Sequence, residues 1–366
     1  MPIVRRSSPF DASRRVALPV ALLLAASAGA VTTRTQTAAG PDPRGITAVD
    51  GLKVGSVTLT ERPTGCTVIL VDGEGAVGGV SQRGGAPGTR ETDLLDPGNM
   101  VDKVNAVVLS GGSAFGLDAA TGAVRWLEEH NIGWDVRIAK VPIVPSAILF
   151  DLPVGGNPKI RPTADCGYKA ASAATSGKVD EGTVGAGAGA TVGKSGGPNR
   201  SMKAGLGSYA IRLPNGLVVG AIVAVNAVGD IIDPDTGTIV AGVRNPDGSF
   251  ADARLLLRSG GPSQTPRAGE NTTIGLVATN AKLTKADVHR MALMADDGFA
   301  RAIFPAHTMG DGDTVFSLAT GTWTGTVNIT QIGALAADVM AKAIVRAATE
   351  STGLPNIPAA RDLPKR

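Results

Sequence analysis

Runs of apolar, often β-branched residues recur along the chain from about residue 45 onwards. They predict β-strands, and several are apolar at successive positions rather than at alternate ones. Strands with that pattern are covered on both faces, so the runs indicate sheets buried between other layers. The predicted strands are CTVILV (66–71), NAVVLS (105–110), GLVVGAIVAV (216–225), TIGLVATN (273–280) and TVFSLAT (314–320).

Stretches typical of helices lie between these runs, at 114–130, 166–177, 284–303 and 331–350. The third carries the clearest signals, because Thr284 and Asp287 approximate a capping box. An apolar stripe follows on one face, formed by Val288, Met291, Ala292, Ala295 and Phe299. The alternation of strands and helices predicts a layered α/β domain with helices over sheets.

The first 30 residues have the pattern of an export signal. Basic residues precede the short apolar run VALPVALLLAA (16–26), and small residues offer cleavage near Ala28 or Ala30. The run is too short to span a bilayer comfortably, which makes a retained membrane anchor the weaker alternative. We therefore expect an exported protein, periplasmic or secreted, with a flexible leader over 31–45.

The charge balance changes once this segment is removed. The chain has 35 Lys and Arg against 32 Asp and Glu, a formal net charge of +3. The first 30 residues hold Arg5, Arg6, Arg14 and Arg15 against Asp11, which accounts for the excess. Because the remainder is near neutral, we expect neither nucleic acid nor an anionic membrane surface as a partner.

Cys66 and Cys166 are the only cysteines. Export would permit a disulfide between them. A single pair this far apart has no framework signature, however, and two buried free thiols fit the sequence equally well. Two cysteines and three histidines without ligand spacing do not form a zinc motif. We expect no metal or other cofactor.

Two glycine-rich segments come close to known motifs. GATVGKSGG (189–197) lacks the glycine that a phosphate-binding loop requires at 188 and leads into a turn, so we expect no nucleotide site there and a solvated Lys194. The overlapping run GTVGAGAGATVG (182–193) indicates instead that two backbones approach closely. LSGGSAFGLDAA (109–120) nearly matches the nucleophile elbow of α/β-hydrolases at Ser113, but its second glycine is one place late. Ser113 is then either a nucleophile or the cap of the following helix.

A third segment, AHTMGDGDTVFSLATG (306–321), places Asp311 and Asp313 two residues apart at the start of a strand. In an extended segment both carboxylates point to the same face. The same letters also fit an ordinary Asp-Gly turn. Beside a cationic amine, however, a carboxylate pair would orient the amine and tune its pKa.

Taken together, the motifs resemble the L-aminopeptidase/D-esterase (DmpA-type) family of self-cleaving N-terminal nucleophile hydrolases, which includes nylon-oligomer hydrolase. The resemblance implies an αββα sandwich, one hydrolase domain over 46–366, a small peptide or amide substrate, and self-association into oligomers of αβ units. It covers roughly 45–360 and rests on RGGAPGTRETDLLDP (83–97), LSGGSAFGLDAATGAVRWLEE (109–129), VPIVPSAILFDLPVG (141–155), RPTADCGY (161–168), AVNAVGDIIDP (224–234), NTTIGLVATNA (271–281) and AHTMGDGDTVF (306–316).

By this resemblance the precursor cuts itself between Asn271 and Thr272, leaving an α chain up to 271 and a β chain of 272–366. Thr272 then becomes an N-terminal nucleophile. Its own α-amino group, with an ordinary pKa of roughly 7.7–8.0, serves as the base. The implied activity is cleavage of amide bonds of small peptides or amides (aminopeptidase or amidase type) through an acyl-enzyme on Thr272.

The resemblance also assigns supporting roles by position. Asn226 matches a residue that donates to the oxyanion. Lys194 matches a lysine near the nucleophile. Asp311 and Asp313 match an acid pair that orients the nucleophile and its amine.

Ser113, Ser146 and Phe150 are expected in the substrate pocket, where Phe150 replaces a tyrosine of the nylon-oligomer enzyme. Two alternatives remain at this point. Ser113 would be the nucleophile of an uncut chain, with His307 and an acid such as Asp313 needed to complete a triad. Otherwise the scaffold would be a non-catalytic exported binding protein, which binds ligand without turnover.

Overall fold

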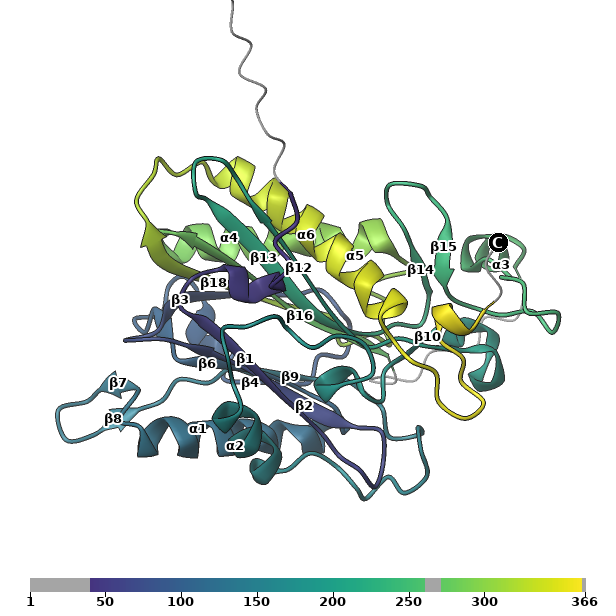
Figure 1. Ribbon diagram of the computed structural model, residues 1–366, viewed down its shortest axis with the longest axis horizontal. Coiled ribbons are helices and arrows are strands. Elements are labelled where there is room, and N and C mark those ends of the chain that lie inside the picture. Colours follow the sequence, from purple (N-terminus) through teal and green to yellow (C-terminus); the bar gives the residue numbers. More distant parts are fainter. Residues whose placement is uncertain (1–39, 261–270, 364–366) are drawn as a thin grey trace, which may run out of the picture. The chain divides into compact units, whose positions relative to one another are not determined.

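The computed structural model describes residues 40–260 and 271–363 (Figure 1). Contacts divide the chain into Met1–Thr37 and Ala38–Arg366, and every described residue belongs to the second unit. The predicted export signal (1–30) and the leader up to residue 39 lie outside the described residues. Within the described ranges, no helix is both long and apolar enough to cross a membrane.

Two large sheets form the centre of the unit, and all five predicted strands lie in them. The six-stranded sheet has the order β12 (Leu206–Arg212), β13 (Val218–Asn226), β16 (Thr272–Ala281), β18 (Thr314–Trp323), β3 (Ala76–Gln82) and β5 (Lys103–Val104). The five-stranded sheet has the order β1 (Leu52–Thr58), β2 (Gly65–Val71), β6 (Ala106–Ser110), β9 (Ser146–Ile148) and β4 (Thr89–Arg90).

Three smaller sheets and six α-helices complete the described parts of the chain. The small sheets pair β10 (Thr191–Val192) with β11 (Met202–Lys203), β7 (Trp134–Asp135) with β8 (Lys140–Val141), and β14 (Asp230–Ile232) with both β15 (Ile239–Ala241) and β17 (Ile303–Phe304). The helices are α1 (Ala119–Glu129), α2 (Ala164–Ser172), α3 (Ala253–Arg258), α4 (Lys285–Ala295), α5 (Asp297–Ala302) and α6 (Ile329–Thr349).

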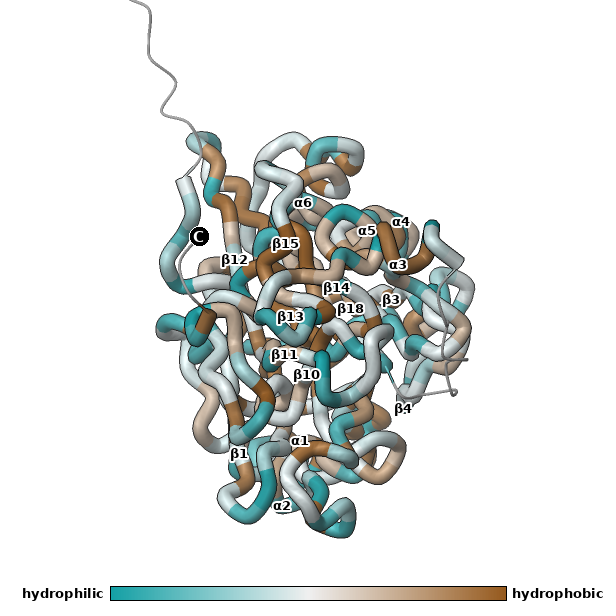
Figure 2. The backbone as a smooth tube through the Cα atoms, turned by 90° about the vertical axis from the view of Figure 1, so that its right-hand side faces the viewer, coloured by the Kyte–Doolittle hydropathy of each residue, from teal (hydrophilic) through white to brown (hydrophobic). Residues whose placement is uncertain are grey.

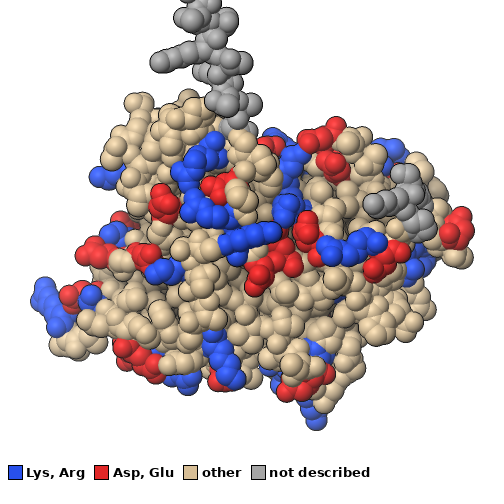
Figure 3. Space-filling model, in the orientation of Figure 1, with Lys and Arg blue, Asp and Glu red and all other residues tan. Residues whose placement is uncertain are grey.

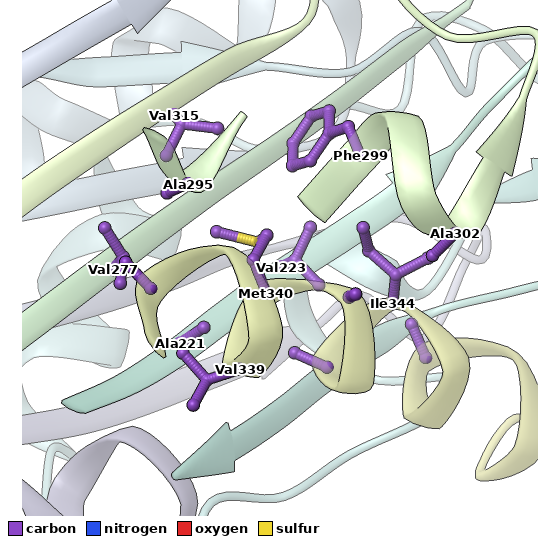
Figure 4. Close-up of a cluster of buried hydrophobic side chains, with 14 of the residues drawn as sticks. Ala221, Val223, Val277, Ala295, Phe299, Ala302, Val315, Val339, Met340 and Ile344 are labelled. Carbon is purple, nitrogen blue, oxygen red and sulfur yellow. The ribbon is translucent and has the colours of Figure 1, made fainter. Parts of the chain in front are cut away.

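Three clusters of buried apolar side chains separate four layers. One lies between the two sheets, with Ile69 and Leu109 from one sheet and Leu276 and Phe316 from the other. The second packs the six-stranded sheet against α4, α5 and α6, and Figure 4 shows Met340 of α6 within it. The third packs the five-stranded sheet against α1 and α2. The helices therefore cover the outer faces of both sheets (Figure 1), and the predicted αββα sandwich is confirmed.

Strand β16 is fully enclosed in the six-stranded sheet, since all ten of its residues are buried. It pairs antiparallel with β13 and parallel with β18. Ile274 and Leu276 face the other sheet, whereas Val277 faces the helices. Figure 2 shows the hydrophobic stretches gathered around these central strands. An uninterrupted apolar sequence is what a strand with both faces covered requires.

The predicted helix over 284–303 is correct at its start and divided near its end. Thr284 and Asp287 form the predicted capping box, and the predicted apolar stripe is buried. Asp296 separates α4 from α5. Asp296 and Gly298 have low helix propensities, and Gly298 packs so close to α6 that a Cβ there would be 2.6 Å from Ala337 O. Packing against α6 thus fixes the place of the break.

Two other helices differ from their predicted bounds. The segment predicted as 114–130 begins as a 3₁₀ turn (Ser113–Asp118), because Gly116 packs tightly against the backbone of Gly111. The segment predicted as 166–177 ends at Ser172, since Thr175 exchanges backbone hydrogen bonds with Val54 of β1 instead. The glycine-rich run 182–193 packs backbone against backbone as predicted: a Cβ on Gly187 would lie 2.1 Å from Leu206 N.

The structure settles the cysteine alternatives in favour of a disulfide. Cys66 of β2 is bonded to Cys166 of α2, and both residues are buried in the outer cluster. The disulfide therefore ties a covering helix to its sheet. Basic and acidic side chains are interspersed over the face shown in Figure 3, in keeping with the balance of charges outside the first 30 residues.

Candidate active site

Thr272 is the first residue of β16, and it is only 1% exposed. Its hydroxyl donates a hydrogen bond to the carbonyl oxygen of the preceding residue, Asn271. The predicted nucleophile therefore lies directly against the peptide bond that the family resemblance expects to be cut. Residues 261–270, which lead into this bond, are outside the described part of the chain.

The carbonyl of Asn271 is also held from the neighbouring segment. The backbone N–H of Gly312 donates to Asn271 O at 3.0 Å, and Asn271 forms a parallel bridge with Asp311. This bridge extends the parallel pairing of β16 and β18 by a few residues. The order of strands in the sheet thus places 311–313 beside the predicted cleavage point.

Asp313 fixes the backbone on both sides of the site. One carboxylate oxygen accepts the N–H of Thr273 at 2.8 Å, and the other accepts the N–H of His307 at 2.9 Å. The latter oxygen also lies 3.0 Å from His307 Nδ1. Burial lowers the pKa of His307, but its hydrogen bond to Asp313 and the charges of Asp313 and Asp296 outweigh that and leave the pKa above its ordinary value.

Asp311 is buried with one carboxylate oxygen unpaired. Its Oδ2 accepts the N–H of Thr308 at 2.7 Å, whereas Oδ1 has no hydrogen-bond partner among the described residues. Burial raises the pKa of Asp311 to about 6, the negative charge of Asp313 adds to this, and the charge of Lys194 opposes it. The structure therefore brings the predicted acid pair together in one buried place.

Asn226 lies on the other side of Thr272. It is the last residue of β13 and stands opposite Thr272 in the antiparallel pairing with β16. The ammonium group of Lys194 donates to Asn226 Oδ1 at 2.8 Å and to Asn226 O at 2.9 Å. Lys194 is half-buried and bonded to Asn226, so the prediction of a solvated lysine from the glycine-rich motif was wrong.

The three predicted pocket residues reach the site to different degrees. Phe150 contacts it through its backbone, because Asn226 Nδ2 donates to Phe150 O at 2.9 Å. Ser146 lies in β9, where its buried hydroxyl has no partner among the described residues. Ser113 has a positive φ of 57° and donates its N–H to Leu149 O. It opens the 3₁₀ turn and does not cap α1, so the capping alternative was wrong.

Asp151 was missed in the sequence, although it supports this part of the site. Its carboxylate and the guanidinium of Arg62 form an ion pair at 2.8 Å between two fully buried side chains. Asp151 also accepts the N–H of Gly112 at 2.9 Å, which anchors the turn before Ser113. Asp151 follows Phe150 in the chain. The ion pair therefore fixes the position of the Phe150 carbonyl, which accepts a hydrogen bond from the Asn226 side chain. A single aspartate within the apolar stretch SAILFDLPV (146–154) is too common a signal to reveal this.

Gly312 was missed for a related reason, since its contribution is a backbone N–H that no side-chain pattern reports. Among the described residues, no group of three or more possible ligands could hold a metal ion. Two surface hollows, one beside Arg244 and Pro358 and the other beside Arg83 and His289, do not include Thr272. The candidate site is a buried junction of β13, β16 and the segment before β18.

Comparisons with known proteins give the family and the fold of the chain. Residues 44–357 match peptidase family S58. An uncharacterised aminopeptidase of Mycobacterium tuberculosis is 42% identical over 346 residues, covering 87% of this chain and 97% of that protein. The 6-aminohexanoate-oligomer endohydrolase of Paenarthrobacter ureafaciens is 32% identical over 316 residues, covering 81% and 84%.

Solved structures of aminopeptidases have a similar fold. The L-aminopeptidase D-Ala-esterase/amidase of Ochrobactrum anthropi, a variant of the N-terminal nucleophile (Ntn) hydrolase fold, aligns with a TM-score of 0.64 at 21% identity and covers 88% of this chain and 92% of its own. A Burkholderia β-aminopeptidase aligns with a TM-score of 0.63 at 22% identity, covering 86% and 88%. The sandwich thus has the Ntn-hydrolase fold. The chain belongs to peptidase family S58, and it is a hydrolase rather than a non-catalytic binding protein.

Proposed function

We propose that this chain cuts itself between Asn271 and Thr272 and then hydrolyses amide bonds with Thr272 as the N-terminal nucleophile. The observation that carries the proposal is the Thr272 hydroxyl lying on the carbonyl of Asn271, at the start of a fully buried strand. A nucleophile and its target are held together there before any substrate binds, which removes most of the entropic cost of bringing them together.

After the cut, the α-amino group of Thr272 acts as the base for its own hydroxyl. Its ordinary pKa of roughly 7.7–8.0 lies close to the working pH, which suits a general base. Asp313 holds the next residue, Thr273, by its N–H, so the hydroxyl and amine keep their place after the chain end is released. Oδ1 of Asp311, which has no hydrogen-bond partner in the described ranges, supplies an acceptor for the new ammonium or amine.

On substrate, the hydroxyl attacks the amide carbonyl, the amine half leaves, and water releases the acyl group from Thr272. Asn226 donates to the oxyanion. Its amide group carries two N–H bonds, of which one is bound to Phe150 O. Lys194, bonded to Asn226 Oδ1, fixes the orientation of that amide, so that its remaining N–H and not its oxygen is available to the developing oxyanion.

We propose small peptides or other small amides as the substrate class. The relatives in the family include an aminopeptidase and an endohydrolase of 6-aminohexanoate oligomers. The substrates that these names imply both contain an amide bond but differ in the groups on either side of it. Phe150 places an apolar ring where a tyrosine hydroxyl is expected in the nylon-oligomer enzyme. That replacement favours a substrate with less polar contact at this position.

We also propose export and assembly into oligomers of αβ units. The buried Cys66–Cys166 disulfide supports export, because such bonds persist in oxidising compartments. The assembly rests on the family resemblance.

The proposed nucleophile is tested by Thr272→Ala, which removes the hydroxyl and is expected to abolish both self-cleavage and amide hydrolysis. Thr272→Ser is the matched control, since it keeps a hydroxyl at the same atom and is expected to retain both. Ser113→Ala is expected to keep both as well. Activity that survives Thr272→Ala but is lost in Ser113→Ala would instead establish the alternative of a serine nucleophile in an uncut chain.

A further inference from the structure

The carbonyl oxygen of Asn271 receives two hydrogen bonds, one from the Thr272 hydroxyl and one from the backbone N–H of Gly312 at 3.0 Å. Asn271 is only 4% exposed, so little water competes for this oxygen. When a nucleophile adds to a carbonyl carbon, negative charge develops on that oxygen. A donor already aimed at it stabilises the charge without reorganisation.

The two strands beside β16 place the site's donors on opposite sides. On the β18 side, the parallel bridge of Asn271 with Asp311 directs the Asn271 carbonyl to Gly312. On the β13 side, Asn226 stands opposite Thr272, and its side chain is bonded to Phe150, Lys194 and Thr191. The carbonyl of the uncut bond therefore faces away from the strand that carries Asn226.

We infer that the backbone N–H of Gly312 is the oxyanion donor of self-cleavage, and that Asn226 serves in this role only during turnover of substrate. The inference rests on the proposed function, because it concerns the same bond. It assigns self-cleavage and substrate turnover, the two reactions of Thr272, to hydrogen-bond donors on opposite sides of β16. Self-cleavage and turnover would then respond separately to changes at these two places.

The step is balanced as follows. The Thr272 hydroxyl oxygen bonds to the carbonyl carbon of Asn271, and the π pair of the carbonyl moves to its oxygen, where Gly312 N–H stabilises the charge. The carbonyl re-forms as the C–N bond breaks, and the proton lost by the hydroxyl is gained by the nitrogen of Thr272. Water then hydrolyses the resulting ester, giving a carboxylate on Asn271 and restoring the hydroxyl.

The absence of a side chain at 312 fits this arrangement. A Cβ there would lie 2.9 Å from Thr272 Oγ1 and 2.8 Å from Ala86 O. Both distances are shorter than real Cβ contacts allow, so any side chain would press on the nucleophile itself. Glycine keeps the N–H on the scissile carbonyl while leaving the Thr272 hydroxyl room to move onto the carbon.

The test replaces the Gly312 amide by an ester, using glycolic acid at position 312 in cell-free translation of the full chain. This removes the N–H and adds no atom beside Thr272. The matched control places lactic acid at Ala86, whose N–H donates to Asp311 O at 2.8 Å. The control loses an equivalent backbone hydrogen bond to the same 311–313 segment and leaves the Asn271 carbonyl untouched. Circular dichroism compares the folding of the two.

We expect self-cleavage to be about 10²-fold slower with the ester at 312 than with the ester at 86. A difference of less than about tenfold, the size expected from an ordinary backbone hydrogen bond, would overturn the inference. If wild-type protein itself stays uncut, the proposed function fails instead. An independent measurement is the through-hydrogen-bond coupling between Gly312 ¹⁵N and Asn271 ¹³C in the uncut Thr272→Ala chain. We expect this coupling to be present, and its absence would also overturn the inference.

Discussion

Asp311 and Asp313 are two residues apart but differ in their hydrogen bonds, and the proposed function gives them different roles. Both oxygens of Asp313 accept backbone N–H groups, from Thr273 and His307, so this carboxylate fixes the start of β16. One oxygen of Asp311 accepts the N–H of Thr308, and the other has no partner within 40–260 and 271–363. We therefore assign positioning of the nucleophile to Asp313 and contact with the released amine to Asp311.

Replacing Asn226 by aspartate tests the oxyanion donor of turnover. Asn226→Asp keeps an oxygen acceptor for Lys194 and Thr191 and removes both side-chain N–H donors. We expect kcat for an amide substrate to fall by about 10²–10³-fold, with a smaller change in KM. The rate measurement uses protein that has completed self-cleavage. A fall in kcat of less than about tenfold would be too small for an oxyanion donor and would contradict the assignment.

Replacing Asp311 by asparagine tests the cost of its buried charge. Burial, together with the charge of Asp313, holds the pKa of Asp311 at about 6 in the folded chain. In the unfolded chain the pKa is about 3.9, so the free energy of unfolding falls as pH rises from about 4 to about 6 and the loss persists above that.

In the uncut Thr272→Ala chain, Asp311→Asn is therefore expected to raise the free energy of unfolding at pH 7 by about 1–3 kcal/mol. The gain should disappear towards pH 4, where Asp311 itself is protonated. Urea unfolding at both pH values measures this. If the chains with and without Asp311→Asn had equal free energies of unfolding at pH 7, the charge of Asp311 would not destabilise the fold.

At the scale of elements, the disulfide between β2 and α2 is expected to stabilise the sandwich. It spans a sequence separation of 100 residues, and such a link restricts the unfolded chain strongly. Cys66→Ala combined with Cys166→Ala should lower the free energy of unfolding by about 2–4 kcal/mol.

Self-cleavage should persist in this double variant, because the disulfide lies in the outer layer beyond the five-stranded sheet. Urea unfolding and a denaturing gel check the two expectations. Unchanged stability would mean that packing alone holds α2 on its sheet.

The elements were more predictable than their ends. Unbroken apolar runs specify the central strands directly, and the capping box of α4 is a local signal. The break at Asp296 depends on how Gly298 meets α6, and α2 ends early because Thr175 pairs with β1. Both are long-range contacts that no local pattern contains.

Sequence motifs predicted the side chains of the candidate site but not its backbone groups. The segment resemblance placed Thr272, Asn226, Lys194 and the acid pair, and the structure brings these residues to one junction. The N–H of Gly312 and the carbonyl of Phe150 act through the backbone, so no residue type marks them. Whether Lys194 is solvated or buried depends on the fold of the glycine-rich segment around it.

At the scale of the whole molecule, the cut would divide one sheet between two chains. Strand β16 would begin the β chain while pairing with β13 of the α chain, and β18 would pair with β3 of the α chain. Every core cluster that contains β16 or β18 also contains strands from the other side of the cut. Self-cleavage should therefore leave the two chains tightly associated.

The central claim is tested most directly by mass spectrometry of the purified protein under denaturing conditions, after size-exclusion chromatography under native ones. We predict one native peak that separates on denaturation into two chains, the smaller being 95 residues long with Thr272 as its first residue. An active protein that remains a single chain, or a small chain that starts at any other residue, would contradict the account.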